Sequence, residues 1–299
     1  MRPKVFVDGR CLTKPMSGIG RVTSESILGL QELGTDIQIV SKRPVHSDFA
    51  KILSSRQKVS RPKKLEKNQP AIFWGPSHAL PITFSKKFKT VVTIHDLIWK
   101  KYKETMRWRT LARETFFFRR AIHVADAVIC VSQSTAADLH EHFPASEIKS
   151  HVIYPGAKQL PVKGSNNGFD YILFVGTIEP RKNLVRLIEA FSKASEKING
   201  NPQLIIAGKR GWKTKEFEEK IRSSIKHTNI SILDAPSDKD IHNLYKYCKF
   251  LALPSLYEGF GLPIAEALKY QKPILTSEIS SMPEVAGSAG YLVDPLSVT

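Results

Sequence analysis

The sequence predicts an α/β protein built from two Rossmann-like domains in tandem. Short runs rich in β-branched residues alternate with helical segments along all 299 residues, and this alternation restarts in the second half of the chain. Strands separated by helices form parallel sheets, and the length is enough for two domains that each have a core. Because ligands bind beyond the carboxyl ends of parallel strands, we expect the site in a cleft that the two domains face.

The first half contains short apolar runs and longer segments with helical periodicity. Strands are expected at 4–7, 36–40, 71–74, 90–94, 127–131 and 151–153. Helices are expected at 20–33, 108–125 and 135–143, where apolar residues recur every three or four positions. The turn residues Tyr154-Pro155-Gly156 and the polar segment 164–168 follow. We therefore expect a linker at 155–169, between an N-terminal domain of residues 1–160 and a C-terminal domain of residues 161–299.

The second half repeats the same alternation. Strands are expected at 171–175, 203–207, 230–233, 250–253, 273–275 and 290–293. Helices are expected at 184–198 and 216–225, and a further helix is expected to begin near Leu262 and Pro263. Ser237 and Asp240 form a capping pattern that opens one more helix.

Composition and cysteine content favour a soluble cytoplasmic protein. Hydrophobic residues make up 41% and charged residues 24%, and no apolar run approaches the length of about 18 residues that a spanning helix needs. The first residues enter a strand pattern without the apolar stretch of a signal peptide. Cys11, Cys130 and Cys248 are far apart, which argues against a disulfide framework or a zinc site.

The charge is concentrated in the first half of the chain. The net charge is +17, and residues 1–160 contain 27 Lys and Arg against 13 Asp and Glu, whereas the remainder contains 18 against 15. A basic domain attracts nucleic acid, anionic lipid or phosphorylated substrates.

Two polar loops follow strands in the first half. Gly18 and Gly20 open a helix, where backbone N–H groups can approach a phosphate, although a tight strand-to-helix turn explains them equally well. His95 follows the apolar strand 90–94 and can donate a hydrogen bond to a sugar hydroxyl or an oxyanion. A histidine satisfied within the core is the alternative, and the position alone favours it.

Two further polar loops lie in the second half. In the loop 176–183, Arg181 and Lys182 stand where a helix begins, and binding a diphosphate would explain cations at a position that the helix dipole disfavours. In the loop 254–261, glycines precede a helix that carries Glu266 among apolar residues, where a carboxylate needs a hydrogen-bond donor such as a ribose hydroxyl. Glu258 lies in the loop itself. Solvent exposure of both glutamates is the alternative interpretation.

These motifs resemble those of the retaining GT-B glycosyltransferases of family 4. Glu258 and Glu266 form the E-x7-E pattern EGFGLPIAE. The resemblance extends to the segments 17–21, 93–99, 131–139, 174–191, 204–212 and 281–286 and thus to nearly the whole chain.

The resemblance implies a role for each matching residue. Glu266 would bind the ribose of the donor nucleotide and Glu258 the transferred sugar, while His95 would face the reacting carbon of the sugar. Arg181 and Lys182 would hold the diphosphate and stabilise the leaving nucleotide in place of a metal, so neither a metal nor a cofactor is expected. The remaining donor-binding residues would be Gly18, Gly20, Gly176, Gly259, Phe260, Gly261 and Leu262.

Two departures from the family pattern stand out. Thr177 follows Gly176 where many members have arginine, so the diphosphate would depend more on Arg181 and Lys182. The family pattern also continues with closing helices beyond the last residue, Thr299. We therefore expect the C-terminal domain to be incomplete, and a catalytically impaired homologue that serves as a binding or scaffold subunit is the alternative function.

The basic first domain bears on the acceptor. It suits docking on an anionic membrane at the inner face of the plasma membrane, and hence a saccharide or polyprenyl-linked saccharide acceptor of surface polysaccharide synthesis. The motif forms favour mannose from GDP-mannose over UDP-sugars. A nucleic-acid-binding protein would fit the charge but not the paired Glu258 and Glu266, so nucleic acid is not expected as a partner.

Overall fold

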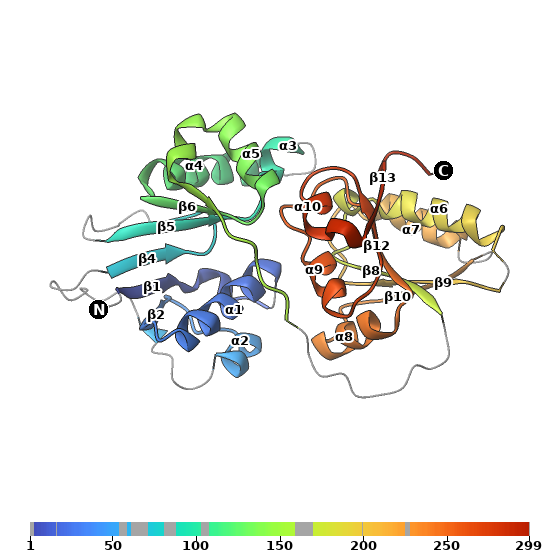
Figure 1. Cartoon of the computed structure of the whole chain (residues 1–299), viewed down its shortest axis with the longest axis horizontal. Coiled ribbons are helices and arrows are strands. Elements are labelled where there is room, and N and C mark those ends of the chain that lie inside the picture. Colours follow the sequence, from blue (N-terminus) through green and yellow to red (C-terminus); the bar gives the residue numbers. More distant parts are fainter. Residues whose placement is uncertain are drawn as a thin grey trace. The chain divides into compact units, whose positions relative to one another are not determined.

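The chain divides into two compact units, Met1–Gly156 and Ala157–Thr299 (Figure 1). The computed structural model describes residues 3–15, 17–53, 59–60, 71–80, 88–102, 108–158, 170–198, 200–224 and 228–298. Each unit contains one parallel β-sheet with helices packed on it. The predicted fold class of two Rossmann-like α/β domains is confirmed.

Within its described residues, unit 1 contains a seven-stranded sheet with the order β3-β2-β1-β4-β5-β6-β7. The strands are β1 (Lys4–Asp8), β2 (Ile37–Val40), β3 (Val59–Ser60), β4 (Ala71–Gly75), β5 (Lys89–Ile94), β6 (Ala127–Cys130) and β7 (Ser150–Val152). The helices are α1 (Gly18–Glu32), α2 (Ser47–Ile52), α3 (Ile98–Lys101), α4 (Trp108–Val124) and α5 (Gln133–His142), with the 3₁₀ turns η1 (Gly9–Leu12) and η3 (Pro144–Lys149).

The part of unit 2 that the structure describes contains a six-stranded sheet with the order β10-β9-β8-β11-β12-β13. The strands are β8 (Tyr171–Val175), β9 (Gln203–Ala207), β10 (Asn229–Leu233), β11 (Phe250–Leu253), β12 (Ile274–Ser277) and β13 (Gly290–Val293). The helices are α6 (Leu184–Ser195), α7 (Lys215–Ser224), α8 (Asp238–Tyr247), α9 (Leu262–Lys269) and α10 (Met282–Ala286), with the 3₁₀ turns η4 (Pro180–Lys182) and η5 (Gly287–Ala289).

Both faces of the first sheet are buried. Along β1, Val5 and Val7 belong to one hydrophobic cluster, and Phe6 belongs to the other. Successive side chains of a strand point to opposite faces, so helices must cover each face of the sheet. In unit 2 a single hydrophobic cluster includes strand residues such as Leu173 and Leu251 together with helical Ile264.

The expected strands and helices are present, with ends that differ by a few residues from the predicted ones. The capping box of Ser237 and Asp240 at α8 is confirmed. The elements that the sequence did not predict are short: β3, α2, α3 and α10 span two to six residues each, too few to display a period.

Candidate functional site

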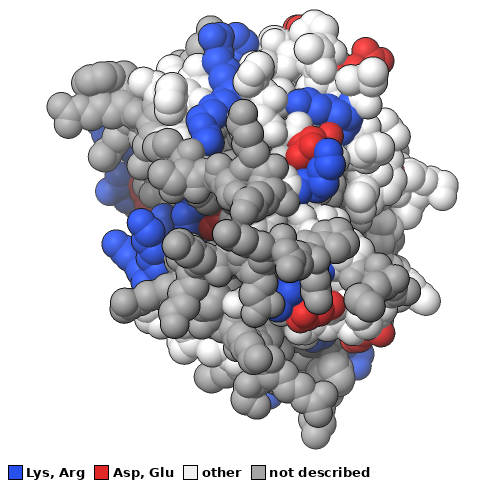
Figure 2. All heavy atoms as spheres, turned by 90° about the vertical axis from the view of Figure 1, so that its left-hand side faces the viewer, with Lys and Arg blue, Asp and Glu red and all other residues white. Residues whose placement is uncertain are grey.

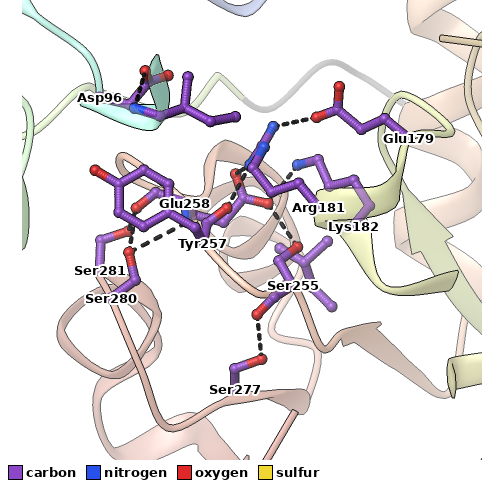
Figure 3. A network of polar contacts seen from close by, with 12 residues as sticks. Asp96, Glu179, Arg181, Lys182, Ser255, Tyr257, Glu258, Ser277, Ser280 and Ser281 are labelled. Carbon is purple, nitrogen blue, oxygen red and sulfur yellow. Dashed lines mark hydrogen bonds and ion pairs between the residues drawn. The ribbon is translucent and has the colours of Figure 1, made fainter. Parts of the chain in front are cut away.

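Three loops of unit 2 meet at the carboxyl edge of its sheet. They follow β8, β11 and β12, which are neighbours in the strand order. Because the strands are parallel, the segments 176–183, 254–261 and 278–281 emerge on the same side. Figure 3 shows their polar side chains turned toward one another. The sheet order therefore brings together residues that lie far apart in the sequence.

Glu258 is the centre of this network, and it is buried, with 7% of its surface exposed. Its carboxylate accepts hydrogen bonds from Lys182 Nζ, from Arg181 Nη1 at 2.9 Å and from Ser255 Oγ at 2.7 Å. Burial alone would raise the pKa of Glu258, but the charges of Lys182 and Arg181 outweigh it and lower the pKa to about 2. Solvent exposure of Glu258, the alternative interpretation of the sequence, is therefore wrong.

Arg181 has a second acidic partner that the sequence analysis did not single out. Its Nη2 donates to Glu179 Oε1 at 2.5 Å, and its Nη1 also donates to the Tyr257 carbonyl at 2.5 Å. Burial raises the pKa of Glu179 above its ordinary value, while Arg181 acts in the opposite direction. We call Glu179, Arg181, Lys182, Ser255 and Glu258 the Glu258 cluster. It combines two cations with two carboxylates.

Asn183 fixes the loop that carries Arg181 and Lys182. Its backbone is left-handed, with φ 59°, a conformation that asparagine tolerates better than most residues. Its Nδ2 donates to the carbonyls of Pro254 at 2.9 Å and Pro295 at 2.7 Å. The two cations lie in η4 directly before α6, as the sequence predicts. The Asn183 amide joins that turn to Pro254, the first residue of the loop 254–261 that carries Glu258.

Hydroxyl groups at the end of β12 and directly after it hold the backbone around Glu258. Ser280 Oγ donates to the Glu258 carbonyl at 2.6 Å, and Ser281 Oγ donates to the same carbonyl at 2.9 Å. Ser277 Oγ donates to the Ser255 carbonyl at 2.6 Å. From the sequence, 281–286 stands out only as a family-like segment, because the adjacency of β11 and β12 cannot be read from one loop.

Glu266 lies in a second polar group, which contains aromatic residues. It is buried, with 5% of its surface exposed, and it accepts a hydrogen bond from Tyr245 Oη at 2.8 Å. Tyr245 stacks on Tyr270, whose hydroxyl lies 2.6 Å from His242 Nδ1. The exposed Glu266 of the alternative interpretation is wrong. Tyr245 supplies one donor for the buried carboxylate, so burial by itself does not require a ribose.

The glycine-rich segment lies between these two groups. Gly261 caps α9 at φ 93°, a conformation that strains other residues, and Leu262 is the first residue of the helix. Phe260 is buried and Gly259 is half-buried. Gly176 lies against the Lys182 side chain, because a Cβ placed on it would be 3.4 Å from Lys182 Cε. Their donor-binding roles stay predictions.

In unit 1 the helix-opening glycines have structural partners. Ser17 caps α1 and accepts a hydrogen bond from the Gly20 amide at 3.2 Å. A Cβ on Gly20 would lie 2.5 Å from the Phe49 ring, so close packing explains this glycine. Gly18 is exposed at the first turn of α1. The proposed phosphate contacts of Gly18 and Gly20 stay predictions.

His95 is half-buried beyond β5, and its Nε2 lies 2.8 Å from the Pro76 carbonyl oxygen. A carbonyl only accepts hydrogen bonds, so Nε2 carries the proton. Burial lowers the pKa of His95, which favours the neutral ring. In that form Nδ1 is an acceptor. The donor role that the sequence suggested would need the charged ring.

No group of three or more His, Cys, Asp or Glu is arranged to hold a metal ion in the part of the chain that the structure describes. Among the described helices, none is both long and apolar enough to cross a membrane.

Comparison with known families and structures identifies the fold. Residues 16–158 match the model of the family described as Glycosyltransferase Family 4, and residues 157–299 match the model described as Glycosyl transferases group 1. The chain belongs to these glycosyltransferases. Their GT-B architecture accounts for the two parallel-sheet units.

Relatives of this glycosyltransferase include bacterial mannosyltransferases. O-antigen chain mannosyltransferase B of Escherichia coli is 29% identical in an alignment of 239 positions that covers 75% of this chain and 61% of the relative. Serotype-specific mannosyltransferase WbdA of Escherichia coli is 29% identical over 70% of this chain and 28% of its own length. The chain therefore spans less than two thirds of these two relatives.

Solved glycosyltransferase structures share the fold at low sequence identity. Anabaena Alr3699/HepE, solved in complex with UDP and glucose, has a TM-score of 0.73 and 16% identity, covering 99% of this chain and 86% of that one. WaaG, a glycosyltransferase involved in lipopolysaccharide biosynthesis, has a TM-score of 0.71 and 15% identity. The superposition covers 98% of this chain and 87% of the WaaG chain.

Proposed function

We propose that this glycosyltransferase is a retaining hexosyltransferase that moves mannose from GDP-mannose to a saccharide or lipid-linked saccharide during surface polysaccharide synthesis. The observation that carries the proposal is the pair of cations at the carboxyl edge of the second sheet, the buried Lys182 and the neighbouring Arg181, whose side chain is 16% exposed. Two cations at the end of parallel strands are suited to a nucleotide diphosphate.

The chemistry would need little beyond charge stabilisation and positioning. Arg181 and Lys182 would hold the diphosphate and stabilise the charge that develops on the leaving nucleotide, so that no metal is needed. Glu266 would accept hydrogen bonds from the ribose, and Glu258 would contact the transferred sugar. His95, neutral and protonated at Nε2, would present Nδ1 as an acceptor to a sugar hydroxyl.

The finer part of the proposal is the identity of the donor, namely mannose as the transferred sugar and guanine as the base of the nucleotide. The relatives named for a donor sugar are mannosyltransferases, among them RfbU of Salmonella typhimurium, which is 21% identical over 95% of this chain. Alr3699/HepE was solved with UDP-glucose. Uridine donors are therefore the competing possibility that an assay must include.

The acceptor proposal rests on the basic first unit. Figure 2 shows Lys and Arg side chains in several places on the described part of one face, with Asp and Glu between them. On α4, Phe116 is 60% exposed and Arg119 is exposed one turn further on. A basic surface with an exposed aromatic ring suits an anionic membrane on which a lipid-linked acceptor would lie.

The deciding experiment measures sugar transfer from GDP-mannose, UDP-glucose and other nucleotide sugars to a polyprenyl-linked saccharide. The wild type and a Glu266→Ala variant are assayed side by side. Transfer from GDP-mannose with an α-linked product, lost in the variant, supports the proposal. Transfer from UDP-sugars alone would mean that the donor is a UDP-sugar and not GDP-mannose. Nucleotide binding without sugar transfer would favour the catalytically impaired homologue. Binding to anionic and neutral liposomes that is equally weak removes the membrane from the proposal.

A further inference from the structure

The nitrogens best placed for a diphosphate already have an anionic partner within the chain. Lys182 Nζ and Arg181 Nη1 both donate to the carboxylate of Glu258. The side chains of Lys182 and Arg181 are only 8% and 16% exposed, so neither cation can turn into solvent to find a second anion. A phosphate that binds them must meet Glu258.

The two carboxylates of the Glu258 cluster differ in what they bind (Figure 3). Glu179 lies two residues before Arg181 in the same loop and binds Nη2 at 2.5 Å. Glu258 comes from the loop after β11 and holds Arg181 Nη1 together with Lys182. If Glu258 moves away, Arg181 stays oriented by Glu179 and by the Tyr257 carbonyl, and the N–H groups of Arg181 and Lys182 that Glu258 occupied become available.

We infer that Glu258 is an internal counter-ion that occupies the phosphate-binding nitrogens of the free chain and is displaced by the nucleoside diphosphate. This inference rests on the proposed function and makes Glu258 a determinant of donor affinity. Binding the donor would release the carboxylate at the moment when the sugar arrives, so the residue that competes with the phosphates becomes available to the sugar.

The charge balance supports displacement. The cluster holds two cations and two carboxylates, so it is balanced before any ligand arrives. A diphosphate brings at least two further negative charges into the site. Excess charge in a buried site is costly, whereas phosphate and carboxylate oxygens are interchangeable acceptors for the same N–H donors.

The movement required is small because the backbone of Glu258 is fixed. Its carbonyl accepts hydrogen bonds from Ser280 and Ser281, and the Ser255 carbonyl accepts one from Ser277. The loop can therefore stay in place while the carboxylate of Glu258 rotates about its side-chain bonds. Ser255 Oγ, which donates to Glu258 at 2.7 Å, would lose its partner in the same step.

The inference can be tested by isothermal titration calorimetry. GDP, UDP and inorganic pyrophosphate are each titrated into the wild type, into Glu258→Gln and into Glu179→Gln. Both variants remove one negative charge, and glutamine keeps a side-chain oxygen acceptor in each case. We expect Glu258→Gln to bind diphosphates about tenfold more tightly and Glu179→Gln to change affinity by less than about threefold. Pyrophosphate should show the same gain, because the competition involves the phosphates.

Equal gains in both variants would mean that net charge alone sets affinity and would overturn the inference, as would an unchanged or weaker Glu258→Gln. A structure of the wild type with bound GDP provides a test without substitution. Loss of the Lys182–Glu258 contact supports displacement, and a retained contact overturns it. Failure of the wild type and both variants to bind any nucleotide overturns the proposed function itself, which separates the two failures.

Discussion

The two units use the carboxyl edges of their sheets in different ways. In unit 2, side chains bind one another through buried ion pairs around Glu258. In unit 1, three side chains bind the backbone of the loop after β4, and Arg10 also pairs with the buried carboxylate of Asp8 at the end of β1. Arg10 donates to the Ala79 carbonyl at 2.6 Å and Arg120 to the Leu80 carbonyl at 3.3 Å, while His95 lies 2.8 Å from the Pro76 carbonyl.

The difference indicates what each edge can recognise. Backbone carbonyls fix the shape of a loop, so the contacts to the loop after β4 in unit 1 are defined mainly by shape. The Glu258 cluster holds charges that a ligand can compete for, so the edge of unit 2 is suited to an anion. Substitutions and pH changes that remove charge should therefore disturb unit 2 more than unit 1.

The largest effect is expected for Lys182→Met. The variant leaves Glu258 buried with Arg181 as its remaining cation, and breaking a buried ion pair costs about 3–5 kcal/mol of unfolding free energy. If Lys182 stabilises the leaving nucleotide as proposed, sugar transfer should fall at least about a hundredfold. Urea unfolding and initial transfer rates measure the two effects.

Lys193→Met is the matched control for this variant. Lys193 pairs with Glu189 one turn away on α6, and its side chain is 54% exposed. Exposed pairs of this kind contribute about 0.5 kcal/mol or less. Similar losses in both variants would show that the Glu258 cluster has no special weight in the stability of unit 2.

The second largest effect is the loss of stability in acid. The pKa of Glu258 is about 2 in the folded chain and about 4.3 in an unfolded one, so the folded state favours the ionised carboxylate. This contribution, about 3 kcal/mol, is fully present above about pH 4.5 and is lost as the pH falls toward 2.

Urea midpoints of the wild type and Glu258→Gln at pH 6, 4.5, 3.5 and 2.5 test this expectation. The stability difference between the two proteins should shrink on acidification, because the glutamine cannot titrate. If the difference in stability between the two proteins stays constant over this pH range, the pKa of Glu258 is not lowered by folding.

A smaller effect is expected for Tyr245→Phe. It removes the hydroxyl that donates to Glu266 and leaves a buried carboxylate oxygen without that donor, at a cost of about 1–2 kcal/mol. If Glu266 binds the ribose, GDP affinity should fall severalfold, whereas pyrophosphate affinity should not change. Tyr291→Phe, at a tyrosine that is 72% exposed, is the control. Equal losses for GDP and pyrophosphate would contradict a role through the ribose.

Most of the fold could be predicted from the regular spacing of apolar residues. Apolar periodicity located the strands and the longer helices, and the Ser237–Asp240 pattern located the start of α8. The short α3, with four residues, has no period to detect. Its structure depends on contacts that form only when the chain folds.

The candidate site could be predicted as a set of residues but not as a network. The loop motifs pointed to Glu258, Arg181 and Lys182, yet their mutual contacts depend on β8 and β11 being neighbours, which a single sequence does not state. Tyr245 lies on α8, 21 residues before Glu266, and no spacing connects the two. Buried polar partners of this kind are visible only after packing.

The smallest effect, and the sharpest contrast with unit 2, concerns the protonation of His95. Since the Pro76 carbonyl can only accept, the proton belongs on Nε2, and burial lowers the pKa of the ring below its ordinary value of about 6.5. The neutral ring therefore stabilises the fold above about pH 6.5, and this contribution is lost as the pH falls through the lower folded pKa. Long-range ¹H–¹⁵N spectra at pH 6.5 should show His95 neutral with the proton on Nε2, with the exposed ring of His123 as the internal reference. A charged ring, or a proton on Nδ1, would mean that His95 presents a donor after all and that its contrast with the charged Glu258 cluster of unit 2 does not hold.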